Sequence, residues 1–178
     1  MFVRGVEIEM VQLELMKEKL AETRKKLLNE LASISFEELN TVPGENNWGV
    51  AQVCHHLHLV EVSFAKAILY GLKKEDAKKS GPKQIQLLND RSKKLPAPEM
   101  VNPREEPFEK QQLVDLLAES RALMLDVINK VEEPSVLVER SVKHPVFGYL
   151  PLYQWIESTY LHEDRHIEQI KEIKAQII

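Results

Sequence analysis

The sequence predicts an all-α fold, a four-helix bundle with a long crossover between its second and third helices. Apolar residues recur with the period of an α-helix in four long segments. Between these segments lie stretches that contain proline, glycine and asparagine, and one of them is much longer than a usual loop. A chain of 178 residues, 43% of them hydrophobic, can also bury one substantial core. We therefore expect a single domain that spans residues 1–178.

The first two helices are expected on either side of a short turn. Residues 6 to about 31 carry apolar side chains at helical spacing, with no proline among them. Residues 33–47 contain serine, asparagine and a Pro-Gly pair, which indicate a turn. Trp48 opens the second helix, which ends near Gly71. Its apolar stripe consists of Val50, Val53, Leu57, Val60, Phe64, Ala67 and Ile68.

The crossover and the last two helices follow. Residues 72–107 are rich in lysine and proline, which predicts a mobile segment near one end of the bundle, with a short helix around Ile85. Helical spacing returns over residues 109–131. Residues 132–150 hold three valines spaced for an extended piece, and the fourth helix is expected from residue 151 to about 175, with a proline at its start.

The composition excludes several classes of protein. The formal net charge is -4, and no long stripe of Lys and Arg stands out, so we expect no binding to nucleic acid. The single cysteine, Cys54, cannot form an internal disulfide, and it fits a small buried hydrophobe better than a metal ligand. No apolar run is long enough for a signal peptide or a membrane span. We expect a cytoplasmic protein with no membrane contact; a homodimer is left open.

Two histidines on the fourth helix suggest a metal site. His162 and His166 are four residues apart, so both imidazoles lie on one helix face and can reach a single ion. Two ligands do not make a site, and the other dense group of histidines is His55, His56 and His58 on the second helix. The alternative interpretation is a helix surface with two solvated histidines. A bundle with three inward-facing imidazoles would instead hold one cation.

Helical geometry distinguishes the histidines of the second helix. His56 lies one turn from Val53 and Val60, at the edge of the apolar stripe, and is the best candidate for the third ligand. His55 is the substitute if this register is wrong by one residue. On the fourth helix Trp155 and Thr159 share the face of His162 and His166, which places that face toward the bundle interior.

Three stretches resemble the DinB-like, YfiT-like metalloprotein superfamily. They are WGVAQVCHHL at residues 48–57, HPVFGYLPLYQW at residues 144–155 and HEDRHIEQI at residues 162–170. In that family a tryptophan begins the second helix, and a histidine eight residues later, followed by leucine, joins two histidines of the last helix on one divalent metal. His56 stands eight residues after Trp48. Gly49 departs from the Ser or Thr that is common at that position.

The resemblance implies a divalent-metal-dependent enzyme on a four-helix bundle of DinB/YfiT-like type, with His56, His162 and His166 on zinc or nickel. It favours a bacterial thiol S-transferase with a small-molecule substrate, in which a low-molecular-weight thiol attacks an electrophile. Three nitrogen ligands leave positions open on the ion, so a hydrolase that activates water is an alternative. A metal-binding stress protein without catalysis is the other alternative, because fold and ligands do not establish turnover.

Two further groups of side chains bear on the site. Gln52 and Gln169 each lie about one turn from a histidine and are expected to hydrogen-bond an imidazole or the open-site ligand. Glu61, Glu163 and Asp164 are the carboxylates nearest in sequence to the histidines. Because none of them shares the histidine face, we interpret all three as solvated helix charges and leave the general base unassigned.

Overall fold

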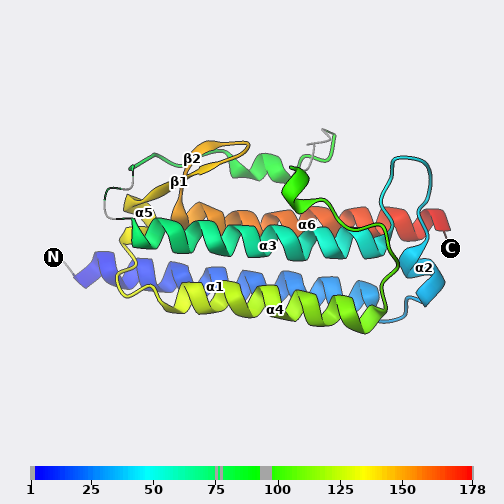
Figure 1. Cartoon of the computed structure of the whole chain (residues 1–178). Coiled ribbons are helices and arrows are strands. Elements are labelled where there is room, and N and C mark those ends of the chain that lie inside the picture. The colour runs from blue at the N-terminus through cyan, green and yellow to red at the C-terminus, as the bar shows by residue number, and fades with distance from the viewer. Residues whose placement is uncertain (1–2, 75, 77, 93–97, 178) are drawn as a thin grey trace.

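The computed structural model describes residues 3–74, 76, 78–92 and 98–177, and four long helices make up most of it (Figure 1). This confirms the predicted all-α four-helix bundle. The long helices are α1 (Val3–Leu31), α3 (Val50–Lys73), α4 (Lys110–Asn129) and α6 (Leu152–Ile177). None of the described helices has the length and apolar character that crossing a membrane requires.

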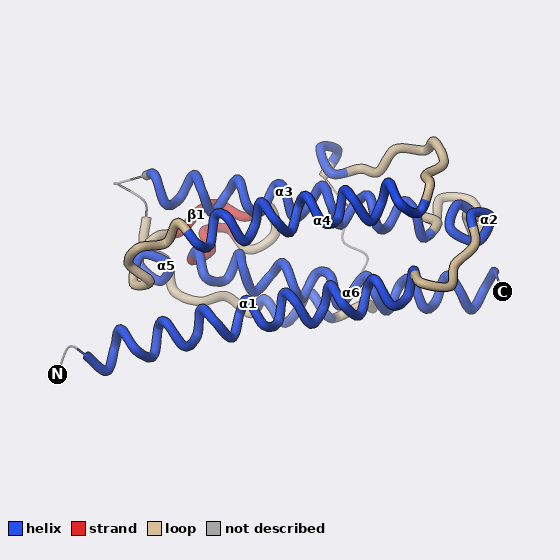
Figure 2. Tube along the Cα trace, turned by 90° about the horizontal axis from the view of Figure 1, so that it is seen from below, coloured by secondary structure: helices blue, strands red, loops and turns tan. Residues whose placement is uncertain are grey.

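The direction of the helices explains the long crossover. α1 and α6 run one way along the bundle and α3 and α4 run the other way, as the colours of Figure 1 show; Figure 2 gives the same helices seen from below. Consecutive antiparallel helices need only a short loop, but α3 and α4 are parallel neighbours. After α3 the chain must therefore travel back along the bundle before α4 can begin.

The described parts of the crossover pack along the sides of α6 and α3 and not at one end of the bundle, so the predicted position was wrong. It contains the 3-10 helices η1 (Ile85–Asn89) and η2 (Glu99–Val101), and η1 confirms the short helix expected near Ile85. Ile85, Leu88 and Val101 are buried. The backbone of Lys83 exchanges two hydrogen bonds, of 2.7 and 2.8 Å, with the side chain of Gln154 on α6. Residues 75, 77 and 93–97 of the predicted crossover lie outside the described residues.

The backbone geometry at the start of α3 explains why residue 49 is a glycine. Trp48 lies just before the helix, and Gly49 is the N-cap, whose N–H donates to the side-chain oxygen of Gln52 at 2.9 Å. A Cβ on Gly49 would lie 2.7 Å from the carbonyl oxygen of Thr41. A serine or threonine cap would therefore clash with the preceding turn, which itself contains the short helix α2 (Phe36–Asn40).

The segment before α6 forms a short helix and a hairpin. α5 (Val136–Glu139) covers two of the three valines for which we predicted an extended piece, so that prediction was wrong there. Its first turn is closed by hydrogen bonds to the backbone carbonyls of residues 133–135. β1 (Ser141–His144), which includes Val142, pairs antiparallel with β2 (Gly148–Pro151), and Leu152 then begins α6.

A polar layer divides the core of the bundle. One apolar cluster contains Leu27, Val53, Leu117 and Ile170, and the other contains Leu20, Ile68, Met124 and Ile156. Between the two clusters each long helix contributes a buried charged residue. These four residues are Arg24 of α1, Glu61 of α3, Arg121 of α4 and Glu163 of α6.

Candidate metal centre

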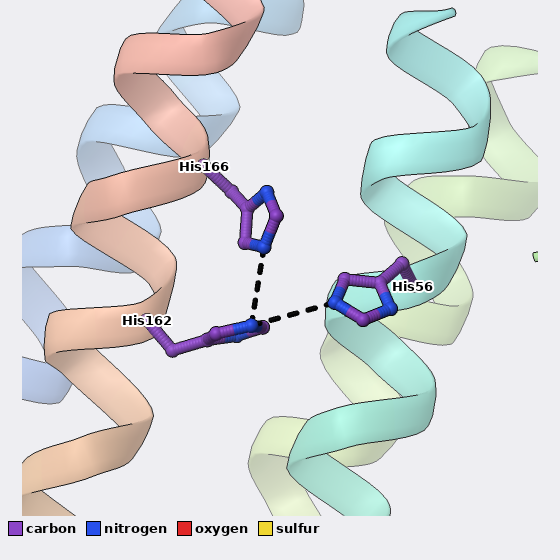
Figure 3. Close-up of side chains that lie close together, drawn as sticks. All are labelled: His56, His162 and His166. Atoms are coloured by element: carbon purple, nitrogen blue, oxygen red, sulfur yellow. Dashed lines mark hydrogen bonds between the residues drawn. The ribbon is translucent and has the colours of Figure 1, made fainter. Parts of the chain in front are cut away.

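Three histidines from two helices meet beside the polar layer (Figure 3). His56 comes from α3, and His162 and His166 come from α6. The Nε2 atom of His162 lies 3.4 Å from that of His56 and 3.1 Å from that of His166. One candidate ligand atom from each residue falls within 4.8 Å of the others. Two nitrogens on one tetrahedral zinc are about 3.3 Å apart, so the group could hold a single ion.

The second ring nitrogen of two of these histidines is held by an acceptor. His56 Nδ1 donates to the carbonyl oxygen of Val101 at 2.8 Å, and His166 Nδ1 bonds the side-chain oxygen of Gln169 at 2.7 Å. A proton on Nδ1 leaves the lone pair of Nε2 free, which is the form that binds a metal. The crossover thus orients His56 through a backbone carbonyl that carries no signal in the sequence.

The two glutamines that we expected to hydrogen-bond an imidazole or the open-site ligand have different roles. Gln169 lies against His166, where the sequence places it. Gln52 instead accepts the N–H of Gly49 and caps the first turn of α3. The proposed contact of Gln52 with an imidazole is therefore replaced by a capping role, which follows from its position three residues after the N-cap.

The other histidines of α3 point away from the group. His55 Nδ1 accepts the backbone N–H of Arg104 at 3.1 Å, and its ring packs on Phe108 with 5.0 Å between ring centroids. His58 Nδ1 donates to the carbonyl oxygen of Leu116 at 2.8 Å. The helical register that selected His56 over His55 agrees with this geometry.

Burial keeps the three imidazoles neutral. It lowers the pKa of His166 to about 3, with a further contribution from the nearby His56. Burial and the two neighbouring imidazoles hold the pKa of His162 well below its usual value, and burial also lowers the pKa of His56. Neutral imidazoles at pH 7 are ready to act as ligands, since a protonated ring has no free lone pair.

A fourth buried histidine, which the sequence analysis did not single out, lies near the group. His144 ends β1, and its ring centroid lies 4.7 Å from that of Trp155 and 5.6 Å from that of Phe64. Its Nδ1 accepts backbone N–H groups of Val146 and Phe147, at 3.1 and 3.4 Å. Burial lowers the pKa of His144 to about 4. The position of this residue in a hairpin gave no helical spacing by which to find it.

The metal-free protein is expected to lose stability as the pH falls from about 6.5 to 5. Unfolded histidine has a pKa near 6.5, while the folded values are about 3 for His166 and about 4 for His144. In this range the unfolded state binds more protons, so acid lowers the free energy of unfolding by up to about 1.4 kcal/mol per pH unit for each group. Above about pH 6.5 this contribution to stability is fully present.

Urea denaturation in the presence of a chelator measures this slope, above the range in which most carboxylates titrate. The His144→Phe variant is the control, because an apolar ring in this aromatic setting should remove only the share of the slope that His144 contributes. A free energy of unfolding that stays level from about pH 7 to 5 in the parent protein would contradict the assignment of buried neutral histidines.

The carboxylates on either side of the histidines are buried and paired, so their interpretation as solvated charges was wrong for two of the three. Glu61 and Glu163 are 3% and 2% exposed. Arg24 pairs with both carboxylates: its Nη2 lies 2.6 Å from Oε2 of Glu61, and its Nε lies 2.7 Å from Oε1 of Glu163. Arg121 does the same: its Nε lies 2.5 Å from Oε1 of Glu61, and its Nη2 lies 2.9 Å from Oε2 of Glu163. Asp164 remains partly exposed, 3.8 Å from Lys26.

Both carboxylates of this ionic network are held by hydrogen bonds to neighbouring side chains. Burial alone would raise the pKa of Glu61, but Arg121 and Arg24 outweigh it and hold that pKa below its usual value. Ser120 Oγ also donates to Glu61 at 2.6 Å, and Thr23 Oγ1 donates to Glu163. Both carboxylates are therefore engaged in fixed hydrogen bonds beside the histidines.

Comparisons with known proteins agree with the fold. Residues 19–170 match the DinB superfamily. The chain is 31% identical over 156 residues to the uncharacterized protein YuaE of Bacillus subtilis strain 168, covering 88% of this chain and 95% of that one. A crystal structure of TT2238, described as a four-helix bundle protein, covers 90% of this chain and 98% of its own, with a TM-score of 0.58 and 21% identity. On this evidence the chain belongs to the DinB superfamily.

Proposed function

We propose that the protein binds one divalent metal ion through the Nε2 atoms of His56, His162 and His166. The observation that carries this proposal is the convergence within 4.8 Å of three imidazoles, of which His56 and His166 are buried and His162 is partly buried. Imidazole nitrogen suits several transition metals, and among these we favour zinc or nickel. Val101 and Gln169 support the proposal, because each holds the second nitrogen of a ligand ring.

We further propose that the centre is catalytic and serves thiol transfer. Three nitrogen ligands leave at least one position on a four-coordinate ion for another molecule, as in catalytic zinc sites. A divalent ion held there would lower the pKa of a coordinated thiol, so that the thiolate forms near neutral pH. The thiolate sulfur attacks the electrophilic carbon of a small molecule, the leaving group departs with the bonding electrons, and the thiol proton goes to solvent.

The nucleophilic thiol must come from a small molecule. Cys54, the one cysteine of the chain, is fully buried in the apolar core of α3. Burial raises the pKa of its thiol to about 12, so it stays protonated at neutral pH. A low-molecular-weight thiol is therefore the co-substrate that we propose.

Hydrolysis is the second candidate, and the ionic network weighs against it. A hydrolase of this kind benefits from a free carboxylate or histidine that accepts a proton from the attacking water. The nearest buried carboxylates, Glu61 and Glu163, already accept hydrogen bonds from both arginines. Most of their hydrogen-bonding capacity is therefore already used, which favours thiol transfer.

Thiol titration of the cobalt-substituted protein tests the proposed function. A thiol that coordinates the ion should add a sulfur-to-metal absorption band and should conjugate to a test electrophile faster than without protein. The His162→Ala variant, mixed with the same cobalt and thiol, is the control and should show neither change. Several bacterial thiols and a panel of electrophiles are compared in parallel.

The three hypotheses predict different results. Hydrolysis predicts that thiols inhibit and that ester or amide substrates are cleaved with a pH dependence set by the activated water. A non-catalytic metal-binding stress protein predicts no spectral change and no turnover, although the metal is bound. No new band and no faster conjugation with any thiol would reject thiol transfer.

A further inference from the structure

A small cavity lies between His162 and the ionic network. It is lined by His162 and Thr159 of α6, by the two carboxylates of Glu61 and Glu163, and by Arg121, with Leu57 and Val60 completing its wall. The space open to a water-sized sphere is about 10 Å³. That is close to the least volume that one ordered water needs, and a buried water also needs two to four polar partners.

His162 forms part of the wall of this cavity. Its Nε2 faces the Nε2 atoms of His56 and His166, so Nδ1 is the polar atom left on the side of the ring away from them. The other two histidines bond Val101 and Gln169 through Nδ1. Within the described part of the chain, no protein group plays this role for His162. Ligand histidines nearly always give their second N–H to a carbonyl, a carboxylate or a water.

The carboxylates of Glu61 and Glu163 can each accept one more hydrogen bond. Glu61 accepts three hydrogen bonds, from Arg24, Ser120 and Arg121. Glu163 also accepts three, from Thr23, Arg24 and Arg121. An ionised carboxylate has about four lone-pair sites, so each has one left. Thr159 also lines the cavity. It donates its O–H to the carbonyl oxygen of Trp155 at 3.0 Å, so its own oxygen can still accept a hydrogen bond.

We propose that one buried water in this cavity links Nδ1 of His162 to the carboxylates of Glu61 and Glu163. The water accepts the Nδ1–H of His162 when the ion is bound and donates its own protons to the two glutamates. The ionic network thereby positions the third ligand of the metal centre. This inference rests on the proposed metal binding, and it makes Glu61 and Glu163 positioning residues that do not touch the ion.

The link would complete a common pattern around the three ligands. Each imidazole would then have an oxygen acceptor on Nδ1: the Val101 carbonyl, the Gln169 amide, and the water held by two carboxylates. The two glutamates offset the charges of Arg24 and Arg121, so a cation beside the network meets no net positive charge from it. Loss of one glutamate would change both the orientation of His162 and this charge balance.

Metal affinity in matched variants is the first test. Zinc affinity is measured by competition with a chromogenic chelator. Glu61→Gln should bind zinc about 10- to 100-fold more weakly, the usual loss when an outer partner of a ligand is removed. Ser120→Ala is the control, since it removes a bond to the same carboxylate without lining the cavity, and it should stay within about threefold of the parent. Equal affinities for these two variants would overturn the proposal.

A second variant guards against a folding defect. Val60→Ile adds one methylene at the cavity wall, which should displace the water and leave every ion pair in place. Nuclear magnetic resonance of the zinc-loaded parent should show a His162 ring N–H with a cross-peak to a long-lived water, and Val60→Ile should lose that cross-peak and bind zinc more weakly. If the network had a purely structural role, the parent would show no such cross-peak, and Val60→Ile would bind zinc as tightly as the parent does.

Failure of the proposed function can be told apart from failure of the water link. If the parent protein binds no zinc, metal binding fails, and the link is then judged in the metal-free protein by cross-peaks from the methyl groups of Val60 and Thr159 to a long-lived water. The absence of such a water in the parent, with or without zinc, would overturn the link alone.

Discussion

Replacing His166 by alanine is expected to remove most of the metal that the purified protein carries. The same loss is expected for His56→Ala and His162→Ala, since each removes one of three nitrogens that converge within 4.8 Å. Zinc bound by four ligands gains about 10–16 kcal/mol, so one ligand accounts for about 3 kcal/mol, or at least a hundredfold in affinity. Elemental analysis should fall from about one metal per chain to a small fraction.

Two histidines of the same helix provide matched controls for this loss. His55 and His58 lie on α3 on either side of His56, but their ring nitrogens bond Arg104 and Leu116. His55→Ala and His58→Ala should therefore keep about one metal per chain. Full occupancy in His56→Ala, with loss in His55→Ala, would move the ligand by one residue. Retention of metal in all three ligand variants would reject the three-histidine centre.

Helical spacing made the bundle and the histidine group predictable. His162 and His166 are four residues apart, and a helix of known period places them on one face. His56 was selected over His55 because only His56 lies one helical turn from both Val53 and Val60, at the edge of the apolar stripe. Both arguments use local periodicity, which the packing of long helices preserves.

The ionic network was missed, although the same periodicity carries a signal for it. Arg24 lies four residues after Leu20 and three before Leu27, and Glu61 lies four after Leu57 and four before Ala65. Each charge thus sits within an apolar stripe, on a face that must be buried. Arg121 lies in the same way between Leu117 and Met124. One inward charge is unremarkable, but one on each of four helices, with two of each sign, indicates a buried ionic layer.

The contacts of the crossover could not be inferred from the sequence. The acceptor that holds His56 is the backbone carbonyl of Val101, and every residue type carries the same carbonyl. The buried residues of η1 and η2 stand among lysines and prolines, whose density suggested exposure. Only the parallel arrangement of α3 and α4 forces this segment along the bundle, and that arrangement is a property of the whole fold.

Replacing Arg121 by methionine is expected to destabilise the metal-free protein by about 3–5 kcal/mol. Methionine keeps most of the length of the side chain but leaves Glu61 and Glu163 with one arginine between them, and both carboxylates are nearly fully buried. Removing one partner of a buried ion pair costs about this much, because the remaining charge is uncompensated. Urea denaturation with a chelator present measures the change without a contribution from lost metal.

Two further variants distinguish the buried network from ordinary surface charge. Lys26→Met removes an exposed charge of α1 that pairs with Glu22, and it should cost less than about 1 kcal/mol. Combining Arg121→Met with Glu61→Gln removes one charge of each sign, so the double variant should be more stable than the sum of the two single losses predicts, by about 1–3 kcal/mol. A loss for Arg121→Met no larger than that for Lys26→Met, or strict additivity in the double variant, would show that the four charges do not act as one unit. A positive coupling would instead show that the four buried charges beside the histidines stabilise one another, because each charge is compensated by opposite charges from other helices.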